Sequence, residues 1–122
     1  MIFRGRWQRD LQAAINPNSL RVADHGVYVT ARSNKLSKFD LGSGEALWTQ
    51  TVPGSSGWVT LADDRVFYMS QGDGLFCFRS DSGEPLVRWE YELVYLCYVE
   101  VWGDIILTGG WRVYTELSAY DR

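Results

Sequence analysis

The residues of this chain that could carry chemistry are few, and they lie in predicted turns. His25 is the one histidine and follows Asp24, while Asp63 and Asp64 stand at the equivalent place further along. With no second histidine or nearby thiolate, a metal site here would need oxygen ligands alone or ligands from another molecule. Aspartate favours turns through local hydrogen bonds. We therefore interpret these residues as solvated turns and predict no metal site.

Other catalytic patterns are equally weak. Paired carboxylates can serve acid–base chemistry, but nothing in the sequence fixes the Asp63–Asp64 pair near a nucleophile, and no Ser/His/Asp set can be assembled. The glycine-rich stretches 72–74 and 109–110 precede no helical pattern, so we interpret both as hairpin turns and not as phosphate loops. The sequence predicts no catalytic residue, no cofactor and no enzyme activity.

Composition is typical of one globular β domain. The chain has 122 residues, of which 46% are apolar and 15% aromatic, which is enough for a core and favours strands. The net charge of −3 gives no reason to expect nucleic acid. Arg4, Arg6 and Arg9 are interpreted as a solvated strand face and not as a phosphate site.

The sequence favours a cytoplasmic protein with free thiols. No run approaches the length of apolar residues that a membrane span needs, and the opening residues lack the layout of a secretory signal. Cys77 and Cys97 lie inside apolar strand patterns, which favours buried free thiols over a disulfide.

A repeat organises the chain. Residues 23–45 align without a gap on residues 62–84, an offset of 39, and adding 39 again takes Val66 to Ile105. The tryptophans Trp7, Trp48 and Trp89 stand 41 residues apart. The repeat divides the chain into three units of about 40 residues, 18–52, 58–92 and 95–122. Residues 3–11 are counted with the third unit. Each unit is predicted to form four short strands, which indicates an all-β propeller with three four-stranded blades.

The third unit stops one strand short, and the missing strand is predicted at the other end of the chain. From Asp40 to Trp48 is eight residues, and counting from Asp121 through Arg122 and on from residue 1 to Trp7 also gives eight. We therefore expect the N-terminal strand to complete the last blade, that of a partner chain in a homodimeric six-bladed ring; the other solution is that the chain is a piece of a longer propeller. The alternative for residues 8–15 is a short helix that ends at Asn16–Pro17.

The stretch from Lys38 to Trp48 resembles the repeat of the quinoprotein-type (PQQ-like) propellers, Ala-x-Asp-x-x-Thr-Gly-x-x-x-Trp. Asp40, Gly44 and Trp48 match, with Ser43 in the threonine position. The second copy keeps Gly83 but has two extra residues before Trp89, and Asp121 matches in the third. The resemblance implies a structural role for these positions, with the tryptophans packing between blades. Quinone dehydrogenases of this family also use a metal, acidic catalytic residues and often a vicinal disulfide, which this chain does not match.

Two function classes follow. The leading one is a non-catalytic scaffold or binding module that presents a ring face to a protein or peptide, with no nucleic-acid or membrane partner. The alternative is a fragment of a quinoprotein-like oxidoreductase or of a sugar-binding propeller. Trp102, Trp111 and Arg112 are the candidate binding residues, because the third unit departs from the repeat there; the other interpretation is that its aromatic residues fill a wider gap between blades.

Overall fold

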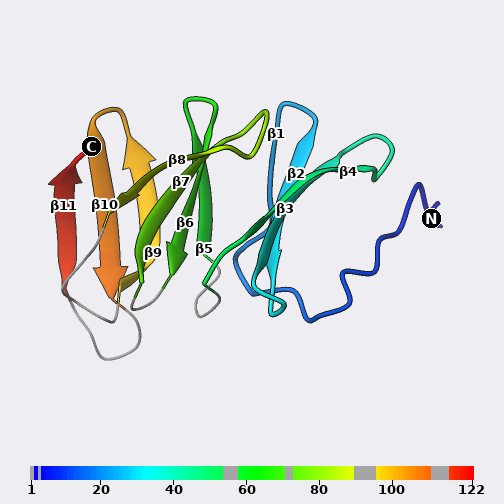
Figure 1. The fold of residues 1–122 in the computed structure, drawn as a ribbon, viewed down its shortest axis with the longest axis horizontal. Helices are drawn as coiled ribbons and strands as arrows, with labels where there is room; N and C mark the ends of the chain where they lie inside the picture. Colours follow the sequence, from blue (N-terminus) through cyan, green and yellow to red (C-terminus); the bar gives the residue numbers. More distant parts are fainter. Residues whose placement is uncertain (1, 3, 54–57, 71–72, 90–95, 111–115) are drawn as a thin grey trace.

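Three antiparallel sheets stand side by side in one row. The computed structural model describes residues 2, 4–53, 58–70, 73–89, 96–110 and 116–122. The two ends of the chain lie at opposite ends of the row (Figure 1). The first sheet contains β1 (Arg21–Ala23), β2 (Gly26–Ala31), β3 (Lys35–Asp40) and β4 (Ala46–Thr51). The second contains β5 (Trp58–Ala62), β6 (Arg65–Ser70), β7 (Gly74–Arg79) and β8 (Pro85–Trp89), and the third β9 (Leu96–Trp102), β10 (Ile105–Gly110) and β11 (Leu117–Asp121).

The hairpin between the first two strands of the first sheet, and that of the second sheet, follow from their turn residues. Asp24 and His25 have φ values of 48° and 62°, and Asp63 and Asp64 have 52° and 58°. Two successive residues with positive φ match the twist of a two-residue hairpin, and aspartate tolerates this left-handed region better than most residues. These residues therefore build turns, as the sequence indicated.

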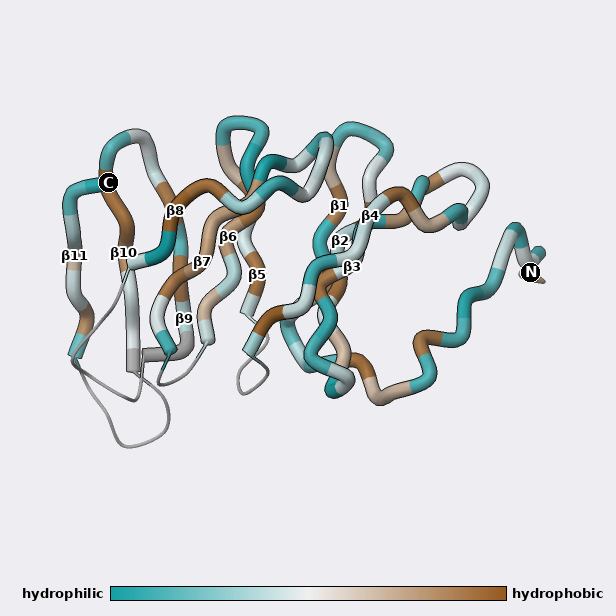
Figure 2. The backbone as a smooth tube through the Cα atoms, in the orientation of Figure 1, coloured by the Kyte–Doolittle hydropathy of each residue, from teal (hydrophilic) through white to brown (hydrophobic). Residues whose placement is uncertain are grey.

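The core consists of two seams between neighbouring sheets. The seam between the first and second sheets buries Tyr28 and Leu36 against Val59, Val66 and Tyr68. The seam between the second and third sheets is built by Phe67, Met69, Leu75, Cys77, Val99 and Ile106. Because successive residues of a strand point to opposite faces, the second sheet supplies side chains to both seams. Figure 2 shows the result, with apolar residues along the strands and hydrophilic residues in the upper turns.

The register of the third unit differs by one residue from the sequence alignment. Ile106 pairs with Tyr120 as Val66 pairs with Phe78, so the offset in this strand is 40 and not 39. One inserted residue reverses which side chains face the core. Ile106 is therefore buried in the seam with the second sheet, whereas Ile105, to which the offset of 39 pointed, is 42% exposed.

One further expectation needs correction, that for Gly109 and Gly110. Gly109 and Gly110 lie within β10, paired with Tyr98 and Leu96, so they are strand residues beside a bulge and not the hairpin turn itself. Residues 4–11 form neither a helix nor a strand with any described residue of this chain. After this segment the chain reaches the first sheet, where Ile15 makes a single bridge to Ala31. The third sheet accordingly has three described strands, ordered β11-β10-β9.

The described part of the chain contains no helix long and apolar enough to cross a membrane. Cys77 is a free, buried cysteine, and burial raises the pKa of its thiol. The side chain of Cys97 lies outside the described residues.

Replacing Gly83 by alanine should destabilise the seam between the first two sheets. Gly83 has φ +76°, and an added Cβ would lie 2.6 Å from Cδ2 of Trp48. Backbone strain and overpacking together should cost about 2–4 kcal/mol in the free energy of unfolding.

The matched control is Gly103→Ala. Gly103 also has positive φ (+57°), but an added Cβ would meet no atom within 4 Å. It should cost only the backbone strain, about 1 kcal/mol. Denaturant unfolding at one protein concentration measures both, and equal costs would contradict a tight contact between tryptophan and glycine.

Candidate interaction surfaces

Trp48 fastens the first sheet to the second. Its indole lies against the backbone of Gly83, and its Nε1 donates a hydrogen bond to the carbonyl oxygen of Ser80 at 3.0 Å. Two residues further on, the Gln50 side chain donates to the carbonyl oxygen of Gly83 at 2.9 Å. Only glycine leaves room for the ring and accepts φ +76° at this position. We call this set of contacts the tryptophan latch.

The N-terminal segment, residues 4–11, repeats the latch on the first sheet. Trp7 lies against Gly44, which has φ +75°, and its Nε1 donates to the carbonyl oxygen of Leu41 at 2.8 Å. Arg9 donates to the carbonyl oxygen of Gly44, as Gln50 does to Gly83 in the next seam. The segment therefore holds the place that β4 holds against the second sheet.

Trp89 stands at a different place in its sheet from Trp48. Trp48 pairs with Lys38, and the residue at this position in the second sheet is Val87, opposite Cys77. Trp89 comes two residues later, opposite Leu75, and stacks on Phe67 with ring centroids 6.1 Å apart. The β7–β8 hairpin has the same pairing as β3–β4, so no residues are inserted before Val87, and Trp89 stands two residue pairs further along the strand.

The aspartate of the repeat closes the turn after the third strand. The Asp40 carboxylate accepts hydrogen bonds from the backbone N–H and the hydroxyl of Ser43, which hold the pKa of Asp40 below its ordinary value. In the second sheet Arg79 takes the place of Asp40, and Asp81 pairs with the Arg79 guanidinium at 3.1 Å. Both acids are structural groups of turns.

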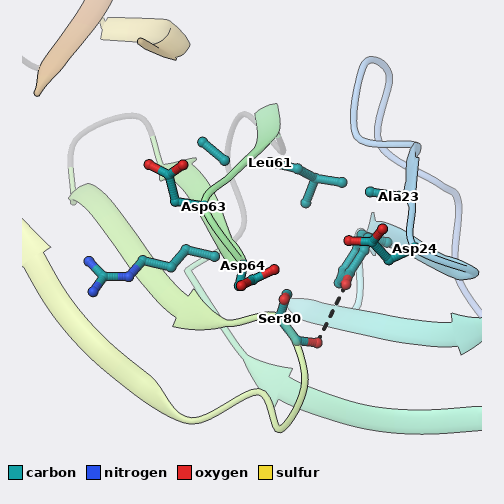
Figure 3. Close-up of a pocket in the computed structure, with 9 residues that line it drawn as sticks. Ala23, Asp24, Leu61, Asp63, Asp64 and Ser80 are labelled. Atoms are coloured by element: carbon teal, nitrogen blue, oxygen red, sulfur yellow. Dashed lines mark hydrogen bonds between the residues drawn. The ribbon is translucent and has the colours of Figure 1, made fainter. Parts of the chain in front are cut away.

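A polar pocket opens between the first and second sheets, at the ends of the hairpins β1–β2 and β5–β6 (Figure 3). Its volume is about 280 Å³. The Tyr28 hydroxyl donates to the carbonyl oxygen of Ser80 within it, at 3.4 Å. Asp24, Asp63 and Asp64 lie around its rim, and the remaining lining residues are Ala23, Leu61, Ala62 and Arg65.

The first sheet has a second face, directed away from the other sheets, which we call the N-side face. Val27, Val29 and Phe39 form a small cluster there, and Leu11 of the N-terminal segment packs against it. A pocket of about 210 Å³ lies beside Leu11. On the same face Val22, which pairs with Val27, is 55% exposed. The N-terminal segment therefore covers this face only in part.

The third sheet has an open face as well, which we call the C-side face. Val99 and Ile106 point into the seam with the second sheet, so the alternation of the strands places Trp102, Ile105 and Leu107 on the opposite side. Trp102 is 81% exposed and Leu117, at the start of β11, is 77% exposed. Trp111 and Arg112, the other candidate binding residues, lie outside the described residues.

A family model described as outer membrane protein assembly factor BamB matches residues 4–91, well over half of the chain. The chain belongs to this family. The PQQ-like repeat indicated by Asp40, Gly44 and Trp48 is thereby confirmed.

Solved structures agree on the fold. The computationally designed Ika8 protein matches with a TM-score of 0.69 and 17% identity over 90% of this chain. BamB from Moraxella catarrhalis matches with a TM-score of 0.65 and 22% identity over 84% of this chain. This chain spans about a third of the length of each, 34%. The designed Ika4 protein matches with a TM-score of 0.56 and 10% identity, over 98% of this chain and 99% of that one. A comparison with curated proteins gave no match.

These comparisons identify the three sheets as blades of a PQQ-like propeller of the BamB family. Among the described residues, no group of three or more His, Cys, Asp or Glu side chains is placed to hold a metal ion. The sequence singled out the tryptophans and glycines of the latch but missed its third member, Arg9 or Gln50. The only available signal was that both residues stand two positions after a tryptophan.

The pKa of Asp81 should depend on Arg79. Hydrogen bonding from the guanidinium and from the backbone N–H of Ser82 lowers the pKa of Asp81 from 3.8 to about 2. We expect Arg79→Gln to bring this pKa most of the way back towards 3.8. Carboxyl carbon shifts followed by NMR titration measure it.

The sign of the linkage follows from that shift. A pKa lowered on folding contributes stability above pH 3.8 that is lost as the pH falls towards 2. Asp81→Asn should therefore lose little further stability between pH 4 and pH 2 through this group. An unchanged Asp81 titration in the Arg79→Gln variant would contradict the ion pair as the cause.

Proposed function

We propose that this chain is a non-catalytic propeller module that presents its turn-bearing face to a protein or peptide partner. The observation that carries the proposal is where the side chains lie, apolar ones in the seams and polar ones in the turns. The aromatic and sulfur-containing groups at the two seams are packed against each other, and the hairpin turns present exposed polar residues such as Asp24, Asp63 and Asp64. Membership of a family whose description names an assembly factor supports the same conclusion.

The partner surface is proposed to include the turns around the 280 Å³ pocket between the first two blades. Loops set on a rigid scaffold commonly carry binding roles, and here two adjacent hairpins present backbone and side-chain hydrogen-bonding groups together. The expected cytoplasmic location stays a prediction, and the family description refers to an outer membrane factor.

Photo-crosslinking inside cells tests the binding role. A benzophenone amino acid at the exposed position Asp64, in the β5–β6 turn, should join the chain to one discrete protein. The matched control is the same group at Leu86, which is 38% exposed on the outer strand β8. Equal products at both positions would contradict a partner on the turn face.

The competing function, a fragment of a quinone-dependent oxidoreductase, makes the opposite thermal prediction. A ligand that binds the folded state raises the melting temperature by mass action. Adding pyrroloquinoline quinone with Ca²⁺ at millimolar concentration should leave the melting temperature of this chain unchanged within 1 °C, an order-of-magnitude bound. A rise of several degrees would favour the oxidoreductase fragment.

We further propose that two copies assemble into a six-bladed ring. Closed propellers have about four to eight blades, and a row of three leaves the N-side and C-side faces without a neighbouring blade. A two-fold ring covers both faces of each copy with the same junction used twice. Light scattering on a size-exclusion column should give twice the 14.0 kDa chain mass. A stable single-chain mass would contradict the ring.

A further inference from the structure

The N-terminal segment holds the place of an outer strand but pairs with no described strand of its own chain. It makes the whole latch on the first blade, through Trp7 on Gly44, the indole hydrogen bond and the Arg9 hydrogen bond. In the part of the chain that the structure describes, the other full latch belongs to β4, whose Trp48 is paired with β3. Residues 4–11 have no such strand beside them among the described residues. Their position is that of the fourth strand of a sheet, so three further strands would be expected beside them on the N-side of the first blade.

The third blade is a sheet that lacks an outer strand among its described residues. β11 pairs with β10 on one side, and no described strand pairs with its other edge. Exposed strand edges recruit further strands because their backbone N–H and C=O groups are unpaired. On the C-side face of the same sheet, Leu117 in β11 and Trp102 in β9 leave apolar surface uncovered. The N-terminal segment has no described partner strand, and the edge of β11 has none either, so each could supply what the other lacks.

The repeat fixes how they would fit together. Tyr120 holds the place of Phe78, and so of Phe39, which puts Ala119 in the place of Lys38 and Ser118 in the place of Ser37. In the first blade Lys38 pairs with Trp48 and Ser37 with Thr49. By the same pairing Trp7 stands opposite Ala119, and Gln8 opposite Ser118.

Charge supports the same fit. The segment carries three arginines, Arg4, Arg6 and Arg9, and one nearby acid, Asp10. The described residues at the two ends of the β11 edge are exposed acids, Glu116 and Asp121. Opposite net charge on the two elements favours their encounter and disfavours pairing of like with like.

We infer that residues 4–11 of one copy form the fourth strand of the third blade of a second copy, antiparallel to β11. This inference rests on the proposed two-copy ring and names its junction. In the junction Trp7 keeps its contact with Gly44 of its own chain. The segment therefore extends the third sheet of the second copy while it packs against the first sheet of its own copy. The N- and C-terminal ends of one chain lie at opposite ends of the row, so the pairing is between chains (Figure 1).

Paired cysteines test the register directly. The double variant Gln8→Cys/Ser118→Cys is made in a Cys97→Ala background, with Cys77 left in place because it is buried. Mild oxidation or a short bismaleimide should give a covalent dimer on non-reducing gels. Peptide mass spectrometry should find residue 8 joined to residue 118 of the other chain.

The single variants Gln8→Cys and Ser118→Cys are the matched controls. They can join only like positions, and they should give less than a tenth of the dimer that the double variant gives. A cross-link confined to 8–8 or 118–118, or no link in a sample whose mass is two chains, would overturn the strand exchange while leaving the ring intact. A single-chain mass together with no link would overturn both.

Trp7→Ala provides a second readout that leaves the β11 edge untouched. Without the latch the segment loses its fixed position on Gly44, so the dimer should dissociate at a concentration at least tenfold higher than for the parent chain. Trp102→Ala, which removes an equally large side chain from the C-side face, shows whether loss of apolar area alone has the same effect. An unchanged dissociation constant for Trp7→Ala would contradict the role of the latch.

Discussion

The structure depends on one contact, a tryptophan ring pressed against the backbone of a glycine in the next sheet. The ring excludes water from the seam, its N–H satisfies a carbonyl group of the turn, and the glycine supplies both the space and the left-handed backbone. A sheet of four short strands cannot bury both of its faces alone. The latch makes the second sheet part of the core of the first, and the apolar seam between these two sheets forms around it.

The same constraint explains why the chain has no recognisable chemical centre among its described residues. In each seam the large side chains meet each other, and Cys77 is buried with a raised thiol pKa. The acids of the repeat are engaged in turns, Asp40 with Ser43 and Asp81 with Arg79. Groups held in this way shape the turns and the seams, which is consistent with the proposed binding role.

Much of the fold could be predicted from spacing, because the glycines and tryptophans of the latch must recur at fixed places. Predictions from residue spacing were wrong where one unit departs from the repeat. One added residue before the β9–β10 hairpin moved Ile105 out of the core and put Ile106 into it, and Trp89 stands opposite Leu75, two residues beyond the place of Trp48. Such shifts leave composition and polarity almost unaltered, so only the pairing of backbones reveals them. The polar pocket was also beyond prediction, since it is made by two turns 39 residues apart.

The second blade differs from its neighbours in having both faces covered, by Tyr28 and Leu36 on one side and by Val99 and Ile106 on the other. When each unit is stabilised mainly by the units beside it, unfolding spreads inwards from the ends like melting in a one-dimensional lattice. Amide protons of β6 and β7 should then be the last to exchange with deuterated solvent, and those of the first and third blades the first. Closing the row into a ring would remove its ends and turn this graded melting into a single cooperative transition.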